Sequence, residues 1–230
     1  MKNKKILFMM LLLQVSMSAF SKMIIKTPAP ACLVVNKVLI VGNSIVEHDP
    51  APSIGWTGNW GMAASVRDSD FVHILTRKIQ AVNNNCLVKF VNIAEFERNY
   101  TTYNLNKLKI FRAFKPDMII IKISENVNDS TSNENNFLGS YKKLLQYLDP
   151  NGKSVKVIVD GFWIKPNVNK IVKQVAIDGK YDFISITELS YDVSNTAKGK
   201  FAHAGVAAHP SDKGMRLIAE RIWDTIKKYF

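Results

Sequence analysis

Five short runs of apolar, largely β-branched residues separate helix-like segments along this chain and restrict it to few folds. The runs are continuous rather than alternating, which is typical of strands covered on both faces. They cover residues 37–42, 87–93, 117–123, 155–160 and 182–187. Helix-like segments occur at about 64–82, 133–149, 167–178 and 211–229. This alternation predicts an α/β fold, a three-layer α/β/α sandwich around a five-stranded parallel sheet.

The length and composition indicate one domain. With 230 residues, 47% of them hydrophobic and 22% charged, the chain can form a single sizeable core. We therefore expect one domain over residues 37–230, preceded by a linker at 22–36.

The first 21 residues have the layout of a secretory signal peptide: a basic start, an apolar run and then small residues. The apolar run is well short of the ~20 residues that a membrane-spanning helix needs. We therefore expect an exported protein, periplasmic or secreted, with no transmembrane segment after signal removal. A lipoprotein cysteine at Cys32 is the alternative, but Cys32 lies some way beyond the apolar run.

Two cysteines, Cys32 and Cys86, follow the predicted signal. An oxidising compartment would let them pair if the strands that follow them are neighbours. They could equally remain two unpaired apolar side chains.

The chain is basic, with a formal net charge of +12 that falls to +9 when Lys2, Lys4 and Lys5 leave with the signal. No helix carries a dense lysine and arginine stripe and no nucleic-acid-binding motif is present, so nucleic acid is not an expected partner. The charge favours an anionic envelope or glycan, or it is a solvated basic surface. The oligomeric state is not predicted.

Polar residues with catalytic chemistry follow several predicted strands. Ser44 stands in "GNS" after the first strand, Asn92 follows the second and Asn126 the third, while His209 precedes the last helix. Because sites in parallel sheets collect at the carboxyl ends of strands, these side chains should converge. A serine hydroxyl, an imidazole and an amide donor are the groups that acyl transfer requires.

Three motifs resemble those of the SGNH/GDSL hydrolases, a family of esterases and lipases. They are "GNSI" at 42–45, "ISEN" at 123–126 and "HPSDKGMRLIAERI" from His209, and "GNWGMAAS" at 58–65 suggests an exported, Bacteroidetes-type bacterial branch. The resemblance covers residues 37–229. It implies a flavodoxin-like three-layer fold, Ser44 as nucleophile, His209 as base, and no cofactor or metal. Asn126 and the Ser44 N–H would form the oxyanion hole.

This sequence departs from the family pattern at several positions. Asn43 and Ser124 replace the Asp and Gly of two motifs. The glycine of a further motif is missing after Asn92, so we expect a backbone N–H near Phe96 or Glu97 to complete the oxyanion hole.

The acid that the family has three residues before the histidine is Val206. A displaced carboxylate, namely Glu47, Asp182 or Glu188, could orient His209, or a backbone carbonyl could accept its Nδ1 proton. We expect the carbonyl, which would leave a serine–histidine dyad.

Residues on loops after the strands are candidates for substrate binding. The aromatic faces of Trp56 and Trp60 could stack on a sugar, or these side chains could pack as a rim. Glu125 could line the pocket and form an ion pair with Arg98, or both could be solvated loop charges.

The residues therefore favour an exported serine esterase that removes an acyl group, expected to be acetyl, from a carbohydrate or other envelope-associated ester. The substrate would be a small molecule or glycan ester. A non-catalytic glycan-binding module is the alternative that the missing acid favours. An O-acyltransferase using the same dyad is a third.

Overall fold

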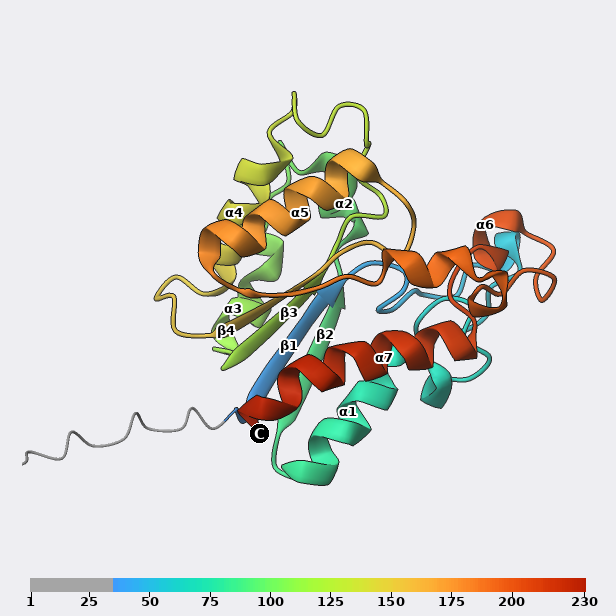
Figure 1. The fold of residues 1–230 in the computed structure, drawn as a ribbon, viewed down its shortest axis with the longest axis horizontal. Coiled ribbons are helices and arrows are strands. Elements are labelled where there is room, and N and C mark those ends of the chain that lie inside the picture. Colours follow the sequence, from blue (N-terminus) through green and yellow to red (C-terminus); the bar gives the residue numbers. More distant parts are fainter. Residues whose placement is uncertain (1–34) are drawn as a thin grey trace, which may run out of the picture. The chain divides into compact units, whose positions relative to one another are not determined.

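The computed structural model describes residues 35–230, which fold around one five-stranded sheet (Figure 1). The predicted signal peptide at 1–21, most of the predicted linker and Cys32 lie outside the described residues. Cys86 is buried, and the structure tests neither of the two alternatives, pairing with Cys32 or two free thiols.

All strand pairs in the sheet are parallel, and the strand order is β2-β1-β3-β4-β5. The strands are β1 (Lys37–Gly42), β2 (Leu87–Asn92), β3 (Met118–Lys122), β4 (Val155–Val159) and β5 (Asp182–Ile184). This is the flavodoxin-like order, in which the chain reverses direction across the sheet between β1 and β3. The segments that follow β1 and β3 therefore meet at the carboxyl edge, where ligands bind in such sheets.

Helices cover both faces of the sheet and complete the predicted three-layer sandwich (Figure 1). Alternate residues of β1 point to opposite faces: Val38 and Ile40 pack under α1 and α7, whereas Leu39 and Val41 pack under α2 to α5. The helices are α1 (Phe71–Val82), α2 (Ala94–Asn99), α3 (Lys109–Ala113), α4 (Phe137–Leu148), α5 (Pro166–Gly179), α6 (Ala204–Ala207) and α7 (Asp212–Ile226).

Several predicted elements are shorter in the structure, and hydrogen bonds to buried aspartates explain two of the differences. The helix expected from residue 64 begins at Phe71, because the buried Asp70 accepts hydrogen bonds from the His73 and Gly61 N–H groups at 2.7 and 3.0 Å. The strand expected over 182–187 ends at Ile184, because Asp160 accepts the Ile186 N–H at 2.6 Å and draws it out of the ladder.

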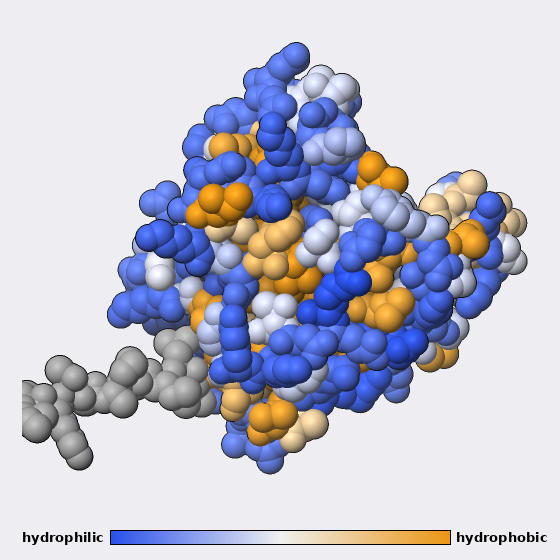
Figure 2. Space-filling model, viewed as in Figure 1, coloured by the Kyte–Doolittle hydropathy of each residue, from blue (hydrophilic) through white to orange (hydrophobic). Residues whose placement is uncertain are grey.

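The face of the molecule shown in Figure 2 is mostly hydrophilic, and its hydrophobic residues form small separate groups. Among the described residues, no helix combines the length and the apolar character that spanning a bilayer requires.

Candidate active site

The turn after β1 places Ser44 at the carboxyl edge of the sheet. Gly42 makes this turn possible, because a β-carbon there would lie 2.9 Å from the Lys122 carbonyl oxygen and 2.3 Å from a methyl group of Val46. The Asn43 carbonyl closes the turn by accepting the Val46 N–H at 2.8 Å. The Ser44 carbonyl accepts the Met62 N–H at 2.8 Å, so the serine backbone is held from both sides of the loop.

His209 lies in the loop between α6 and α7, with its ring against Ser44. Its backbone carbonyl accepts the Ala197 N–H at 2.8 Å, which fixes the loop. The Ser44 Oγ is 2.8 Å from His209 Nε2, and His209 Nδ1 is 2.7 Å from the Gly205 carbonyl oxygen. A carbonyl can only accept, so Nδ1 carries the proton and Nε2 is free to accept the serine hydrogen. The expected backbone partner of His209 is therefore Gly205.

The environment of His209 keeps its ring neutral. Burial lowers the pKa of His209 to about 4, and the Gly205 hydrogen bond opposes this shift only in part. The ring of Trp163 meets the imidazole edge-on at 5.0 Å and contributes to this burial. At neutral pH the imidazole is thus in the form that can take a proton.

The carboxylates considered as substitutes for the missing acid do not reach the imidazole. Glu188 pairs with Arg221, and Asp182 accepts from Lys228 and Tyr229. Across residues 35–230, no carboxylate, that of Glu47 included, forms a hydrogen bond or ion pair with His209.

Val206, at the position of the family acid, is fully buried in an apolar cluster on α6. This cluster also contains Trp56, Met62 and Ala197. The position therefore has a packing role in this chain.

Asn126 lies at the same edge, and its amide is held on both sides. Its Nδ2 donates to Glu97 Oε2 at 2.6 Å, and its Oδ1 accepts from the Arg98 guanidinium at 3.1 Å. A carboxamide has two N–H bonds, so one stays available to the cavity. The Ser44 N–H is a second donor, since none of the described residues accepts a hydrogen bond from it.

Of the two residues expected to supply a backbone N–H to an oxyanion hole, Glu97 has its N–H occupied: it donates to the Ile93 carbonyl at 3.3 Å. The N–H that begins α2, that of Ala94, is taken by the Asn92 side chain at 2.8 Å.

A network of buried polar side chains lies behind the serine and Asn126. Asn43 Nδ2 donates to Glu97 Oε1 at 3.1 Å and to Glu125 Oε2 at 2.6 Å, so one amide joins two carboxylates. Lys122, fully buried at the end of β3, forms an ion pair with Glu125. Burial, and then the charge of Glu125, raise the pKa of Glu97 to about 7. The pKa of Glu125 is lowered, because Lys122 outweighs its burial.

Glu125 therefore does not line the pocket with Arg98 as expected. Its side chain is buried and is held by Lys122 and by the Phe162 N–H at 2.8 Å. The charged string "ISEN" suggests a solvated loop, but the structure directs its glutamate inward.

A cavity of about 470 Å³ opens over Ser44, His209 and Asn126. Its wall comes from the turn after β1, the segment after β2 and the α6 region. Besides those three residues it is lined by His48, Asp49, Ile54, Met62, Asn92, Ala94, Glu95, Arg98, His203, Gly205 and Val206. Arg98 is thus at the site as predicted, while His48 and His203 were not predicted to line it.

Trp56 and Trp60 do not line this cavity. Trp56 is 3% exposed and packs edge-on against Trp60 with ring centroids 5.6 Å apart. Trp56 also packs against Phe201, and its Nε1 donates to the His48 carbonyl at 3.2 Å. Of the two alternatives for these residues, stacking on a sugar and packing beside the site, the structure shows the packing, so their assignment to substrate binding is wrong.

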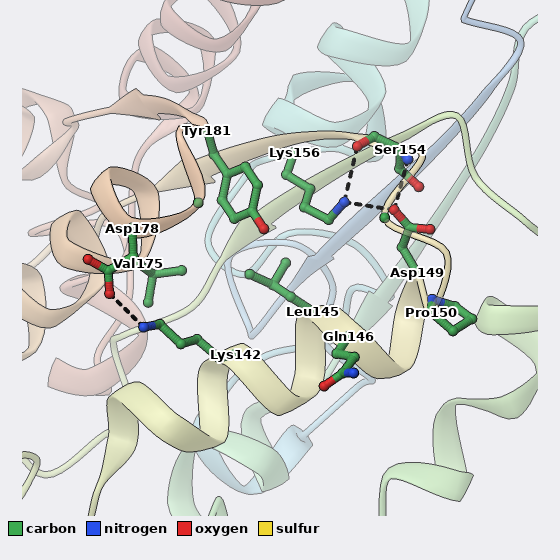
Figure 3. A pocket seen from close by; sticks show the side chains of 12 residues that line it. Lys142, Leu145, Gln146, Asp149, Pro150, Ser154, Lys156, Val175, Asp178 and Tyr181 are labelled. Atoms are coloured by element: carbon green, nitrogen blue, oxygen red, sulfur yellow. Dashed lines mark hydrogen bonds and ion pairs between the residues drawn. The ribbon is translucent and has the colours of Figure 1, made fainter.

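A larger cavity, about 610 Å³, lies at the opposite, amino edge of the sheet between α4, α5 and the start of β4 (Figure 3). Ion pairs of Lys156 with Asp149 and of Lys142 with Asp178 cross its wall. Its one serine, Ser154, donates to the Pro116 carbonyl, and no histidine or cysteine is among its lining residues. It therefore lacks a nucleophile and base pair, and the cavity over Ser44 is the candidate active site.

Comparison with known proteins gives matches by structure only. No family model matches this sequence, and no curated protein does. A two-domain esterase active on acetylated mannans has a TM-score of 0.56 at 15% identity, over 84% of this chain and 48% of its own. The α/β hydrolase LAE5, from the metagenome of Lake Arreo in Spain, has a TM-score of 0.54 at 16% identity, over 86% and 97%.

A third similar structure is a catalytic mutant of Axe2, an acetylxylan esterase from Geobacillus stearothermophilus. Its TM-score is 0.53 at 18% identity, over 84% of this chain and 94% of that one. At these identities the similarity establishes a shared fold: the chain has the same three-layer α/β/α fold as these esterases and this hydrolase.

Proposed function

We propose that this protein is a serine esterase of the SGNH hydrolase type that removes acetyl groups from a carbohydrate ester. The observation that carries the proposal is the geometry around one imidazole. His209 Nε2 lies 2.8 Å from the Ser44 hydroxyl, and its Nδ1 hydrogen is fixed on the Gly205 carbonyl. This is the arrangement of a nucleophile, a base and an orienting group.

In the first half-reaction, Ser44 Oγ attacks the ester carbonyl carbon while His209 Nε2 takes the hydroxyl proton. The oxygen of the tetrahedral intermediate accepts hydrogen bonds from the Ser44 N–H and from the free N–H of Asn126. The carbon–oxygen bond to the alcohol then breaks, and His209 returns the proton to the departing alcohol. An acyl group remains on Ser44.

In the second half-reaction, a water molecule replaces the alcohol. His209 removes its proton as it attacks the acyl carbon, and the second intermediate collapses to free acid and the serine hydroxyl. The Gly205 carbonyl accepts the Nδ1 hydrogen throughout, but it is uncharged and stabilises the imidazolium less than a carboxylate would. We therefore expect a slower enzyme than one with a complete triad.

The substrate class is supported by the cavity and by the structural neighbours. A cavity of about 470 Å³ suits a small acyl group on a sugar, and polar side chains such as Arg98 and Asp49 line it. Several proteins with this fold act on acetylated polysaccharides: Axe2 is an acetylxylan esterase, and the two-domain esterase is active on acetylated mannans.

We also propose that the enzyme acts outside the cytoplasm, because its first 21 residues have the layout of a signal peptide. An exported esterase would meet polysaccharide or envelope esters there. The test of this part is whether the full chain, expressed in a bacterium, is found in the periplasm or the medium with its first residues removed. Full-length protein in the cytoplasm would contradict it.

The activity is tested by measuring acetate released from acetylated xylo- and manno-oligosaccharides by the wild type and by Ser44→Ala. We expect release by the wild type alone, with both proteins folded by circular dichroism. Binding of the oligosaccharides without release would support the non-catalytic glycan-binding module. Transfer of acetyl to an added sugar in preference to water would support an O-acyltransferase.

A further inference from the structure

The side chain of Glu97 is buried beside the proposed oxyanion hole, and the steps above do not use it. It is fully buried on α2, yet it faces three donors. Its Oε1 accepts from Asn43 Nδ2 at 3.1 Å and the Ser124 N–H at 2.6 Å, and its Oε2 accepts from Asn126 Nδ2 at 2.6 Å. A carboxylate is the side chain that can accept from all three.

The contact between Glu97 and Asn126 fixes the orientation of the amide. Without a partner, the side chain of Asn126 could turn about its last torsion angle and present its oxygen to the cavity. Oε2 of Glu97 accepts one N–H, and the Arg98 guanidinium donates to Oδ1 at 3.1 Å from the other side. Both contacts require the same orientation, and that orientation leaves the second N–H for the substrate oxygen.

The groups around Glu97 come from several elements. The turn after β1 contributes Asn43, a hydrogen-bond donor. The buried Tyr141 of α4, whose pKa is raised by burial and then by the nearby charge of Glu97, forms no hydrogen bond with the described residues. From the end of β3 and the segment after it, Lys122 supplies the nearby positive charge and Glu125 a second negative one. Burying a carboxyl group costs desolvation free energy, which its hydrogen bonds and nearby charges must together offset. Such an arrangement points to a specific role for Glu97.

We propose that Glu97 is a positioning residue, whose carboxylate holds the Asn126 amide with one N–H aimed at the developing oxyanion. This deepens the esterase function proposed above and rests on it. Oxyanion donors accelerate a reaction only when they are aimed in advance, so the contribution of Asn126 depends on Glu97.

Glu97→Gln is the variant that isolates this role. It keeps the shape of the side chain, and its oxygen can still accept from Asn43 and Ser124 at the Oε1 position. The NH₂ group of the variant then faces Asn126 Nδ2, so a donor meets a donor. Asn126 must turn its oxygen toward that NH₂ group, which removes its own N–H from the cavity.

The expected result is a fall in kcat of ~10²-fold, the scale for the loss of one oxyanion donor, with KM changed little. Asn126→Ala should fall by a similar factor, and the double variant should be no slower than Asn126→Ala alone. Glu220→Gln, the same change at an exposed ion pair on α7, is the control and should keep wild-type kcat. Losses that multiply in the double variant, or an unchanged kcat in Glu97→Gln, would overturn the proposal.

A second measurement uses the wild type, so it holds even if Glu97→Gln fails to fold. In protein labelled with ¹⁵N-asparagine, the Asn126 side-chain signals are those missing from Asn126→Ala. We expect two well-separated protons, one of them slow to exchange with solvent. Rapid exchange of both protons, as in a free surface asparagine, would contradict the positioning role. An inactive wild type with a held amide would instead count against the esterase function alone.

Discussion

Asn43 stands where the family motif has an aspartate, and its buried contacts explain the exchange. Its Nδ2 donates to both Glu97 and Glu125, while its Oδ1 accepts the Ile45 N–H at 3.2 Å. An aspartate would place a third carboxylate between two others, with Lys122 as the nearby cation. The amide is thus the side chain that this network requires.

Asn43→Asp should therefore destabilise the fold at neutral pH. A buried charge without a partner costs about 3 to 5 kcal/mol, and urea unfolding should show a loss on that order. Asn151→Asp, the same change on an exposed turn, is the control and should leave the free energy of unfolding nearly unchanged. Equal stability of Asn43→Asp and the wild type would mean that the network accommodates a third carboxylate.

The lowered pKa of His209 predicts an unusual acid limit for activity. The imidazole must be neutral to accept the serine proton, and its pKa is about 4 instead of the ordinary 6.5. Two falls in kcat/KM are therefore expected as the pH is lowered: one near 7, where Glu97 gains a proton and no longer holds the Asn126 N–H, and one near 4, where His209 gains a proton. Asn126→Ala lacks the amide that Glu97 holds, so its profile should show the fall near 4 alone; a fall centred near 6.5 in this variant would show that the His209 ring is exposed in solution.

The lowered pKa of His209 also makes the free energy of unfolding depend on pH. The unfolded chain binds a proton at His209 near pH 6.5, whereas the folded chain resists it down to about 4. Stability from this group is therefore present above pH 6.5 and decreases as the pH falls from 6.5 toward 4. Melting temperatures measured across this range separate loss of folding from loss of catalysis.

The residues at strand ends could be predicted from the sequence, but the buried network could not. Ser44, Asn126 and His209 each follow or precede a regular element, so topology alone brings them together. Glu97 and Glu125 could be predicted only as charges that line the pocket or lie in solvent, because nothing in their local sequence indicates burial. One signal was present: "MIIIK" ends an apolar strand on Lys122, and a lysine continuing such a run calls for a buried acidic partner.

At the scale of elements, α6 determines how His209 is held. The Gly205 carbonyl of this short helix accepts the hydrogen bond from the imidazole, and Val206 of the same helix is buried in the apolar cluster with Trp56 and Met62. His203 caps it by accepting the Val206 N–H at 3.4 Å. The helix thus combines the orienting group and the packing that fixes it, in place of the acid seen in the family motif.

Val206→Asp is accordingly expected to weaken the protein without raising its activity. The Nδ1 hydrogen of His209 is already bound to Gly205, so the new carboxylate would be buried in an apolar cluster without a partner. We expect a loss on the order of 3 to 5 kcal/mol in urea unfolding. Val206→Thr, which keeps the shape without a charge, should lose less. A more active Val206→Asp would show that the histidine can exchange the carbonyl for a carboxylate.

The turn after β1 is the second element on which the site depends. Gly42→Ala would place a β-carbon 2.9 Å from the Lys122 carbonyl oxygen, which is backbone and cannot move aside cheaply. We expect a loss of about 1 to 3 kcal/mol, the usual cost of overpacking, together with a lower kcat because Ser44 shifts with the turn. An unchanged melting temperature and kcat would mean that the turn relaxes without disturbing the serine.

For residues 35–230 as a whole, the pattern of apolar runs was sufficient to predict the fold. All five strands and the four longer helices occur where the sequence pattern placed them. Parallel strands covered on both faces need continuous apolar runs, and helices on those faces need one apolar side each. Element ends were predicted less well. Asp70 determines where α1 begins through its contact with Gly61, and Asp160 determines where β5 ends through its contact with Ile186. The hydrophobic periodicity of the sequence gives no information about such contacts.

The residues that line the substrate cavity also could not be predicted from the sequence. Trp56 and Trp60 were expected at the cavity because they follow the serine motif closely. Trp56 instead packs against Trp60 and against Phe201, a residue far away in the chain, and so connects the loop after β1 to the segment before α6. Which face of a loop meets substrate depends on such long-range packing.

The central claim, that Ser44 is a nucleophile activated by His209, is tested most directly by trapping the acyl-enzyme. The protein is mixed with p-nitrophenyl acetate, quenched in acid within the first turnover, digested and analysed by mass spectrometry. We expect a burst of p-nitrophenol and one acetyl group on the peptide containing Ser44, and neither in Ser44→Ala or His209→Ala. Turnover of the ester with no acetyl on Ser44, or an equal burst from Ser44→Ala, would contradict it.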